Sequence, residues 1–204
     1  MINFQGTREV ITYAQKYISG KTLDLGAGSS KYREIIKQKA QDYVTFDVVP
    51  GPNIDVVGDA LNTPFGSATF DTVISTQVLE HIEKPWRMVK EIRRILKKNG
   101  ICVLTAQFLE PYHADPHDYF RYTIEGIRSL FENEGFETIE CSSYGQLFSV
   151  LAGFIRISWF SHYQKRKLGS WKITHFLEKA AQFLNRFTKN KIIYSDVYMI
   201  AKKV

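Results

Sequence analysis

Apolar residues along this chain follow two different spacings, one typical of buried strands and the other of amphipathic helices. Short runs rich in β-branched and aromatic residues occur at 22–25, 43–47, 54–59, 70–75, 101–108 and 136–142. Between or before them, apolar residues recur every three or four positions, at 10–18, 31–40, 85–100 and 124–135. The first spacing predicts strands and the second predicts helices.

The clearest helix in this pattern spans residues 85–100. Pro85 suits the first helical turn, Lys97 and Lys98 suit the negative end of the helix dipole, and Gly100 suits a C-terminal cap. We therefore expect the helix to run from Pro85 to a cap at Gly100. Its apolar face would consist of Met88, Val89, Ile92, Ile95 and Leu96.

The alternation of strands and helices predicts an α/β domain with a parallel sheet covered on both faces. In such sheets, ligands bind beyond the carboxyl ends of the strands, so the residues that follow each strand are the informative ones. No internal repeat interrupts this order, and the 204 residues fit a single domain over 1–204.

Acidic residues follow three successive predicted strands. Asp24 precedes a turn with glycines at 26 and 28, Asp47 ends the second strand, and Asp59 ends the third. The turn lets the backbone approach a ligand closely, and an acid at position 47 is placed to accept ribose hydroxyls. A dinucleotide fingerprint would need a third glycine where Lys31 stands, which disfavours NAD. Each acid, taken singly, could equally be a loop-capping residue.

Five motifs, in this order and spacing, resemble the class I S-adenosylmethionine-dependent methyltransferases, and in particular the type 11 family of bacteria. They are LDLGAGSS, TFDVVP, VGDALNTPF, FDTVISTQVLEHIEKPWRMVKEIRRILKKNG and ICVLTAQF. The resemblance covers about residues 22–142, and VYMIAKKV is similar to the last, antiparallel strand of that family. It implies a Rossmann-like, seven-stranded, mostly parallel sheet and S-adenosyl-L-methionine as cofactor.

The resemblance also implies a role for each matching residue. The methionine part of the cofactor would lie along Asp24, Gly26, Ala27 and Gly28. Asp47 would hold the ribose hydroxyls, Asp59 and Ala60 would meet the adenine, and Thr76 with Gln77 would close over the sulfonium. The chain departs from the family at Ser30, where a third glycine is frequent, and we expect altered loop detail there with cofactor binding retained.

The loop after the fifth strand, PYHADPHDYFRYT, is rich in ionisable groups and is the expected acceptor site. Its candidates for catalysis are His113, His117, Asp118 and Arg121, with Asp115 beside them. A general base there would assist methylation of a hydroxyl. The structural alternative is an ion pair between Asp118 and Arg121 that only holds the loop together.

Glu80 and His81 permit a second hypothesis. They resemble the end of the E-x-x-E-H motif of metal-assisted O-methyltransferases, including those that methylate ribose at the 3′ ends of small RNAs. His117 or His113 would complete a ligand set for a divalent cation. Gln77 occupies the first position of that motif, and an amide is a weaker ligand than a carboxylate. We therefore expect no metal site.

Basic residues concentrate at the C-terminal end of the chain. Residues 151–204 hold eleven lysines and arginines against two acidic residues, and an amphipathic insertion at about 147–190 precedes the last strand. We expect a helical lid, and its bases together with Trp159, Phe160 and Trp171 would also suit an anionic membrane surface. RNA is the less favoured partner, because no RNA-binding module is recognisable.

These features together predict methyl transfer from S-adenosylmethionine to an oxygen of a small molecule, a saccharide or a lipid-linked glycan. The alternative is a cofactor-binding partner subunit without turnover. The two cysteines lack metal-ligand spacing, and the N-terminus has no signal-peptide pattern, so we expect a cytoplasmic protein, peripheral at the membrane if the lid binds lipid. The acceptor itself and the oligomeric state cannot be deduced from these residues.

Overall fold

One seven-stranded sheet forms the centre of the protein. The computed structural model describes residues 4–114, 116–160, 170–187 and 192–204, with the backbone alone at 156–160, 170–175, 178 and 182. The strand order is β3-β2-β1-β4-β5-β7-β6. The bounds are β1 Lys21–Leu25, β2 Asp42–Asp47, β3 Val56–Val57, β4 Phe70–Thr76, β5 Leu96–Gln107, β6 Phe136–Gln146 and β7 Tyr194–Lys203.

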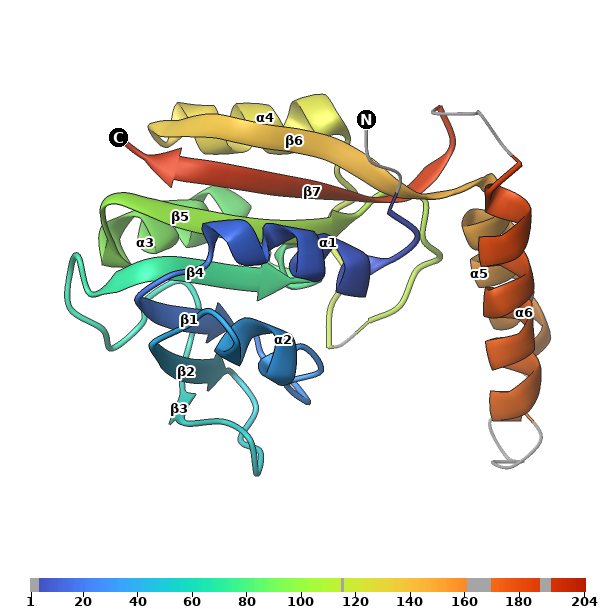
Figure 1. The fold of residues 1–204 in the computed structure, drawn as a ribbon, viewed down its shortest axis with the longest axis horizontal. Coiled ribbons are helices and arrows are strands. Elements are labelled where there is room, and N and C mark those ends of the chain that lie inside the picture. Colours follow the sequence, from blue (N-terminus) through green and yellow to red (C-terminus); the bar gives the residue numbers. More distant parts are fainter. Residues whose placement is uncertain (1–3, 115, 161–169, 188–191) are drawn as a thin grey trace.

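The pairing of the strands confirms the predicted topology. β1 to β5 pair in parallel, whereas β7 runs antiparallel between β5 and β6 (Figure 1). Successive strands after β1 are added toward one side of the sheet, as β2 and β3, whereas β4 and β5 are added on the other side of β1. The parallel strands β1 and β4 therefore lie side by side at this change of direction, and both end at the same edge of the sheet. This edge is where a ligand is expected in an open α/β sheet.

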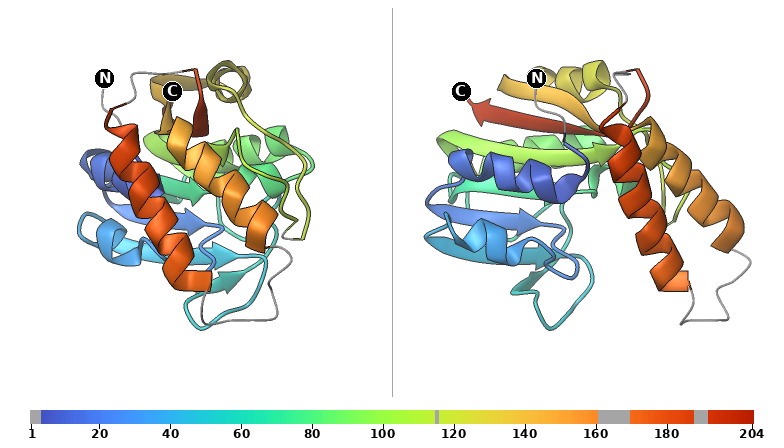
Figure 2. Two further views of the ribbon diagram at one scale, coloured as in Figure 1. Left: turned by 90° about the vertical axis from the view of Figure 1, so that its right-hand side faces the viewer. Right: turned by 45° about the vertical axis from the view of Figure 1, so that its right-hand side comes forward.

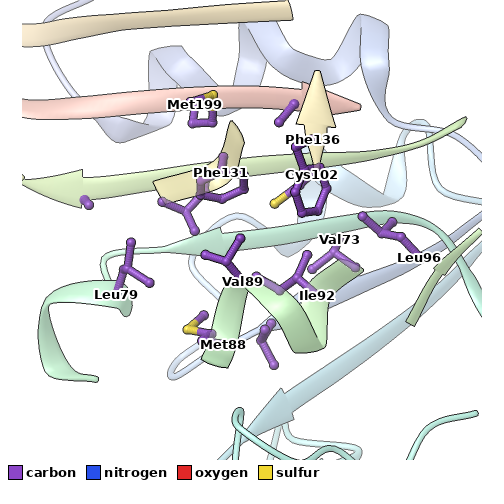
Figure 3. Close-up of a cluster of buried hydrophobic side chains, with 14 of the residues drawn as sticks. Val73, Leu79, Met88, Val89, Ile92, Leu96, Cys102, Phe131, Phe136 and Met199 are labelled. Carbon is purple, nitrogen blue, oxygen red and sulfur yellow. The ribbon is translucent and has the colours of Figure 1, made fainter. Parts of the chain in front are cut away.

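Helices cover both faces of the sheet (Figure 1). α1 Thr7–Ala14 and α2 Arg33–Lys37 lie on one face, and α3 Pro85–Ile95 and α4 Ile124–Asn133 lie on the other. Neighbouring strand residues point to opposite faces, so Val73 packs with α3 while Ile74 packs with α1. The α3 side of this core includes Met88, Val89 and Ile92, all fully buried (Figure 3).

The C-terminal end of α3 differs from the sequence prediction. The helix ends at Ile95, not at a cap on Gly100, and Leu96 already pairs with Phe70 as the first residue of β5. The last helical carbonyls accept tertiary hydrogen bonds, since Ala68 N donates to Arg94 O at 3.0 Å and Thr69 N donates to Ile95 O at 2.8 Å. Burial of Leu96 and these bonds stabilise the earlier end, against the local preference of the sequence for a longer helix.

The predicted insertion before the last strand is a helical hairpin. α5 Leu147–Phe160 and α6 Ser170–Asn185 pack against each other and project from the edge where β1 and β4 end (Figures 1 and 2). Buried Asn185 holds the base of the hairpin, because its side chain accepts from Phe148 N at 3.0 Å and donates to Ser149 Oγ at 2.8 Å. Within the described part of the chain, neither this pair nor any other helix combines the length and apolar character needed to cross a bilayer.

Candidate cofactor and acceptor site

A glycine turn after β1 forms the first part of the site. Gly26 has φ +77°, and a Cβ there would lie 2.2 Å from Val78 Cγ2, so only glycine fits. Gly28 has φ +51°, and a Cβ there would meet nothing within 4 Å. The backbone amides of Gly26 and Ala27 both donate to Phe46 O, at 2.8 and 3.0 Å. The turn is therefore bound to the end of β2, with open space beside Gly28.

Asp47 lies at the end of β2, against this turn. Its Oδ2 accepts from the amide of Gly28 at 2.8 Å, and its Oδ1 accepts from the amide of Val49 at 2.9 Å. The residue is half-buried, and the side chains of Val48 and Val49 beside it are exposed. The structure therefore presents a carboxylate and apolar surface next to a turn of two glycines and Ala27.

Asp24 is buried at the end of β1. The hydroxyl of Tyr43 donates to its Oδ2 at 2.6 Å. Burial raises the pKa of Asp24 to about 6, the hydrogen bond from Tyr43 opposes this, and the nearby Asp47 carboxylate adds to it. Sequence analysis did not identify Tyr43, whose aromatic position in β2 looks like an ordinary strand residue.

Asp59 and Ala60 follow β3, and Thr76 ends β4. Asp59 is exposed and accepts from the amide of Leu61 at 2.8 Å, which is the loop-capping role that the sequence left open. Ala60 and Thr76 are half-buried. All three lie at the same edge of the sheet as the glycine turn, because the parallel strands β1 to β4 end there.

Gln77 directs its side chain toward the last strand of the sheet. Its backbone has φ +56°, and its amide nitrogen donates to the Tyr144 hydroxyl at 2.9 Å and to Asp196 Oδ1 at 3.1 Å. Burial raises the pKa of Asp196 to about 6. Neither Tyr144 nor Asp196 was a predicted site residue. The only signal in the sequence is that Asp196 is an acid directly before the apolar run of the last strand.

In the loop after β5, Asp118 and Arg121 form the ion pair that was the structural alternative. The guanidinium contacts both carboxylate oxygens, and the Asp118 side chain is 1% exposed. Asp118 also accepts from the amide of His113 at 2.9 Å, and Arg121 donates to the carbonyls of Glu110 and Pro111. Arg121 holds the pKa of Asp118 down at about 2. The pair thus connects both ends of the loop.

Three histidines meet where this loop folds back over the turn after β4, the 3₁₀ helix Leu79–His81. His81 Nδ1 lies 2.5 Å from the carbonyl of His117, and the rings of His81 and His113 are 5.3 Å apart, edge to face. His113 Nδ1 lies 3.1 Å from the carbonyl of Pro111, and its Nε2 lies 3.2 Å from the amide nitrogen of Gln107. His117 is exposed against Tyr119, and Asp115 lies outside the described residues.

Glu80 is the most unusual residue of the region. It is fully buried, neither carboxylate oxygen has a hydrogen-bond partner within the described part of the chain, and burial raises its pKa to about 8. Among the residues described, no three His, Cys, Asp or Glu side chains are grouped so that they could hold a metal ion. The arrangement around His81 and His113 thus offers no complete ligand set there for the metal-assisted hypothesis.

Comparison with known proteins agrees with the geometry. Residues 23–104 match the type 11 methyltransferase domain family. The demethylmenaquinone methyltransferase of Paenarthrobacter aurescens is 30% identical over 114 residues, which are 51% of this chain and 45% of that protein. The chain spans 38–45% of the length of this and other curated relatives that it matches.

Solved structures share the fold across nearly the whole chain. Phosphoethanolamine N-methyltransferase 2 of Haemonchus contortus, in complex with S-adenosyl-L-methionine, has a TM-score of 0.63 at 17% identity. The match covers 100% of this chain and 54% of the Haemonchus chain. The [4+2]-cyclase SpnF has a TM-score of 0.65 at 17% identity, and the match covers 96% of this chain and 79% of the SpnF chain. At these identities the likeness is one of fold.

The fold, the turn with its two strand-end acids and the family match together define the class of this protein. The chain has the fold of the class I S-adenosylmethionine-dependent methyltransferases, and its residues 23–104 match the type 11 methyltransferase domain. S-adenosylmethionine is the cofactor of this class, and the open space at Gly28 beside the Asp47 carboxylate fits a ligand that carries ribose hydroxyls.

Proposed function

We propose that this protein transfers the methyl group of S-adenosylmethionine to a hydroxyl oxygen of a small molecule or saccharide, including a lipid-linked glycan. The observation that carries the proposal is the contact between Asp47 and the backbone of Gly28 at the edge where β1 and β2 end. This hydrogen bond connects Asp47, the acid expected to bind the ribose of the cofactor, with the glycine turn expected to lie along the methionine part of the cofactor. The cofactor, when bound, supplies a methyl group on a positively charged sulfur.

Asp47 is already oriented toward the turn before any ligand arrives. Two backbone amides hold its carboxylate, and each oxygen keeps a further lone pair for a ribose hydroxyl. Such preorganisation lowers the entropy that binding would cost. Asp24, behind the turn, keeps the end of β1 in place through Tyr43.

His81 is the side chain best arranged to take the proton of the acceptor hydroxyl. A carbonyl accepts from an imidazole only when the facing nitrogen carries hydrogen, so His117 O assigns hydrogen to Nδ1 of His81. Its Nε2 lone pair has no partner among the described residues, whereas Nε2 of His113 faces the Gln107 amide. The bound cofactor would supply the methyl group to the acceptor oxygen, and His81 Nε2 would accept the proton that the hydroxyl loses.

Cofactor binding is tested by calorimetric titration with S-adenosylmethionine and S-adenosylhomocysteine. We expect Asp47→Ala to weaken binding by about 1.5–3 kcal/mol, the size of a charge-assisted hydrogen bond. Asp42→Ala, at the exposed opposite end of the same strand, is the matched control and should bind like the wild type. Equal binding by the wild type and Asp47→Ala would contradict the assigned site.

Methyl transfer is tested by release of S-adenosylhomocysteine with a panel of sugar, polyol, phenol and amine acceptors. We expect turnover with a hydroxyl acceptor, and His81→Gln should lower it about 10²–10⁴-fold. His113→Gln should lower it less, and neither variant should change cofactor affinity. Cofactor binding by the wild type without turnover on any acceptor would favour the non-catalytic partner instead, and turnover on amines alone would contradict the oxygen acceptor.

A further inference from the structure

α6 carries an aromatic stripe on the side that faces away from its packing contacts. Phe176, Phe183 and Phe187 are 69%, 57% and 73% exposed. At 100° per residue, Phe176 and Phe183 fall within about 20° of each other on α6, and Phe187 lies in the turn that follows the helix. Ala181 and Asn185, which are buried, lie on the opposite side of the same helix.

Two basic side chains border this stripe. Lys179 and Arg186 are exposed and lie three residues after Phe176 and Phe183, so both fall on the same edge of the stripe. The rings of Phe183 and Phe187 also contact each other, edge to face, with centroids 5.4 Å apart. Large exposed aromatic residues in contact with one another mark a surface that binds something apolar.

α5 also carries exposed apolar side chains. Leu151, Phe154 and Ile155 are each more than two-fifths exposed. The hairpin projects from the sheet as a separate arm (Figure 2). Trp159, Phe160 and Trp171, which the sequence placed at an interface, lie outside the described side chains.

We propose that the hairpin of α5 and α6 binds the surface of an anionic phospholipid bilayer through the phenylalanine stripe of α6 and its adjacent bases. The charge of this part of the chain selects the occupant, because residues 147–187 hold seven basic residues and one acidic residue, and the exposed Lys179 and Arg186 lie beside the stripe itself. Helices that lie at a membrane interface bind through apolar and aromatic side chains at the level of the headgroups and through basic side chains that face anionic lipids.

The inference is independent of the methyl acceptor and of the proposed reaction. A lid that only closed over a small substrate would have no need of bases beside an aromatic stripe on the face turned away from α5. Membrane binding by this arm would bring the adjoining strand edge, with its glycine turn and Asp47, close to the bilayer surface. That position would suit an acceptor presented at the membrane.

The test is cosedimentation of the full chain with extruded vesicles of equal parts phosphatidylcholine and phosphatidylglycerol, compared with pure phosphatidylcholine. We expect the wild type to bind the mixed vesicles, with binding weakened by added salt. Lys179→Gln with Arg186→Gln should lower the partition constant about 25-fold, since each base near an anionic surface contributes about fivefold. Phe183→Ser with Phe187→Ser should lower it about tenfold or more.

Matched controls come from exposed side chains of α3, which packs against β5, α4 and the 3₁₀ helix Leu79–His81. Arg87→Gln with Lys90→Gln, and separately Trp86→Ser, should leave vesicle binding unchanged. Circular dichroism and calorimetric titration with S-adenosylhomocysteine report folding and cofactor binding for every variant. Absence of wild-type binding to mixed vesicles, or equal losses in the α3 controls, would overturn the proposal. A dimer in solution that the Phe183 and Phe187 changes abolish would assign the stripe to a second copy of the chain.

Discussion

Gln77 donates its side-chain amide to the carboxylate of Asp196 over 3.1 Å, although 119 positions separate the two residues. The contact lies where β4 ends and the antiparallel β7 begins. Burial raises the pKa of Asp196, and hydrogen bonds from Ser195 and Gln77 counteract this. The amide therefore makes a buried acid tolerable at the edge of the sheet where the cofactor is expected.

Replacing Gln77 with glutamate should make folding sensitive to pH. A second carboxyl beside Asp196 has its pKa raised by the like charge and by burial, so its cost is absent below about pH 4 and grows as the pH rises. We expect Gln77→Glu to lose about 2–4 kcal/mol of unfolding free energy at about pH 7 and little at about pH 4. Urea unfolding at both pH values measures this. Gln77→Met is the uncharged control, and a loss that is the same at both pH values in Gln77→Glu would contradict the prediction.

Glu80 should destabilise the fold at neutral pH. Its pKa is 4.5 in an unfolded chain and about 8 when folded, so folding carries a cost that appears as the pH rises through 4.5 and is complete above about 8. We expect Glu80→Gln to be more stable than the wild type by about 3 kcal/mol at about pH 7 and equal to it at about pH 4. Thermal and denaturant unfolding across this range test the sign. Glu83→Gln, an exposed neighbour, should change the stability by less than about 0.5 kcal/mol.

The two glycines of the turn should respond differently to a methyl group. Gly26→Ala places Cβ against Val78 in a left-handed conformation, so we expect a loss of about 2–4 kcal/mol of stability. Gly28→Ala meets nothing and should lose only about 1 kcal/mol, from its backbone conformation.

Cofactor binding distinguishes the two glycine variants further. The Cβ of Gly28→Ala enters the open space beside Asp47, and we expect binding of S-adenosylhomocysteine to fall at least about tenfold in a folded protein. Calorimetric titration next to an unfolding curve measures both effects. Normal binding by Gly28→Ala would place the cofactor elsewhere.

The ion pair of Asp118 and Arg121 should control the order of the loop after β5. The pKa of Asp118 is lowered from 3.8 to about 2, so the pair contributes stability above about pH 4 that is lost as the pH falls toward 2. We expect Asp118→Asn to speed protease cleavage within residues 109–121 about tenfold at neutral pH, while far-ultraviolet circular dichroism stays unchanged. Glu137→Gln, which neutralises an exposed acid of β6, is the control.

A double variant distinguishes the contribution of the ion pair from the contributions of Asp118 and Arg121 taken singly. Because the two side chains share the ion pair and each also has contacts of its own, Asp118→Asn with Arg121→Gln should cleave faster than either single variant but by less than the sum of the two effects. Fully additive effects of the two changes would mean that the ion pair itself does not hold the loop and that only the separate contacts of each side chain do.

The amino-acid sequence by itself determined the class of fold and the acids at the strand ends. β-branched runs bounded by turn residues and helices of 3.6-residue period are local patterns, and a parallel order follows from their alternation. Asp24, Asp47 and Asp59 could be placed at one edge because every parallel strand ends there. The helical insertion before β7 could also be predicted, since the apolar run that became α5 and the amphipathic period of α6 both lie within the insertion itself.

Only the tertiary structure decided which side chains meet. The end of α3 depends on the amides of Ala68 and Thr69, and the direction of Gln77 depends on Tyr144 and Asp196 from distant strands. The exposure of the phenylalanine stripe on α6 depends on which face α5 covers, and the free Nε2 of His81 depends on the carbonyl of His117. Each of these features depends on contacts between different segments of the chain. The local spacing of residues cannot predict such contacts, because the packing of the whole sheet and its helices brings the segments together.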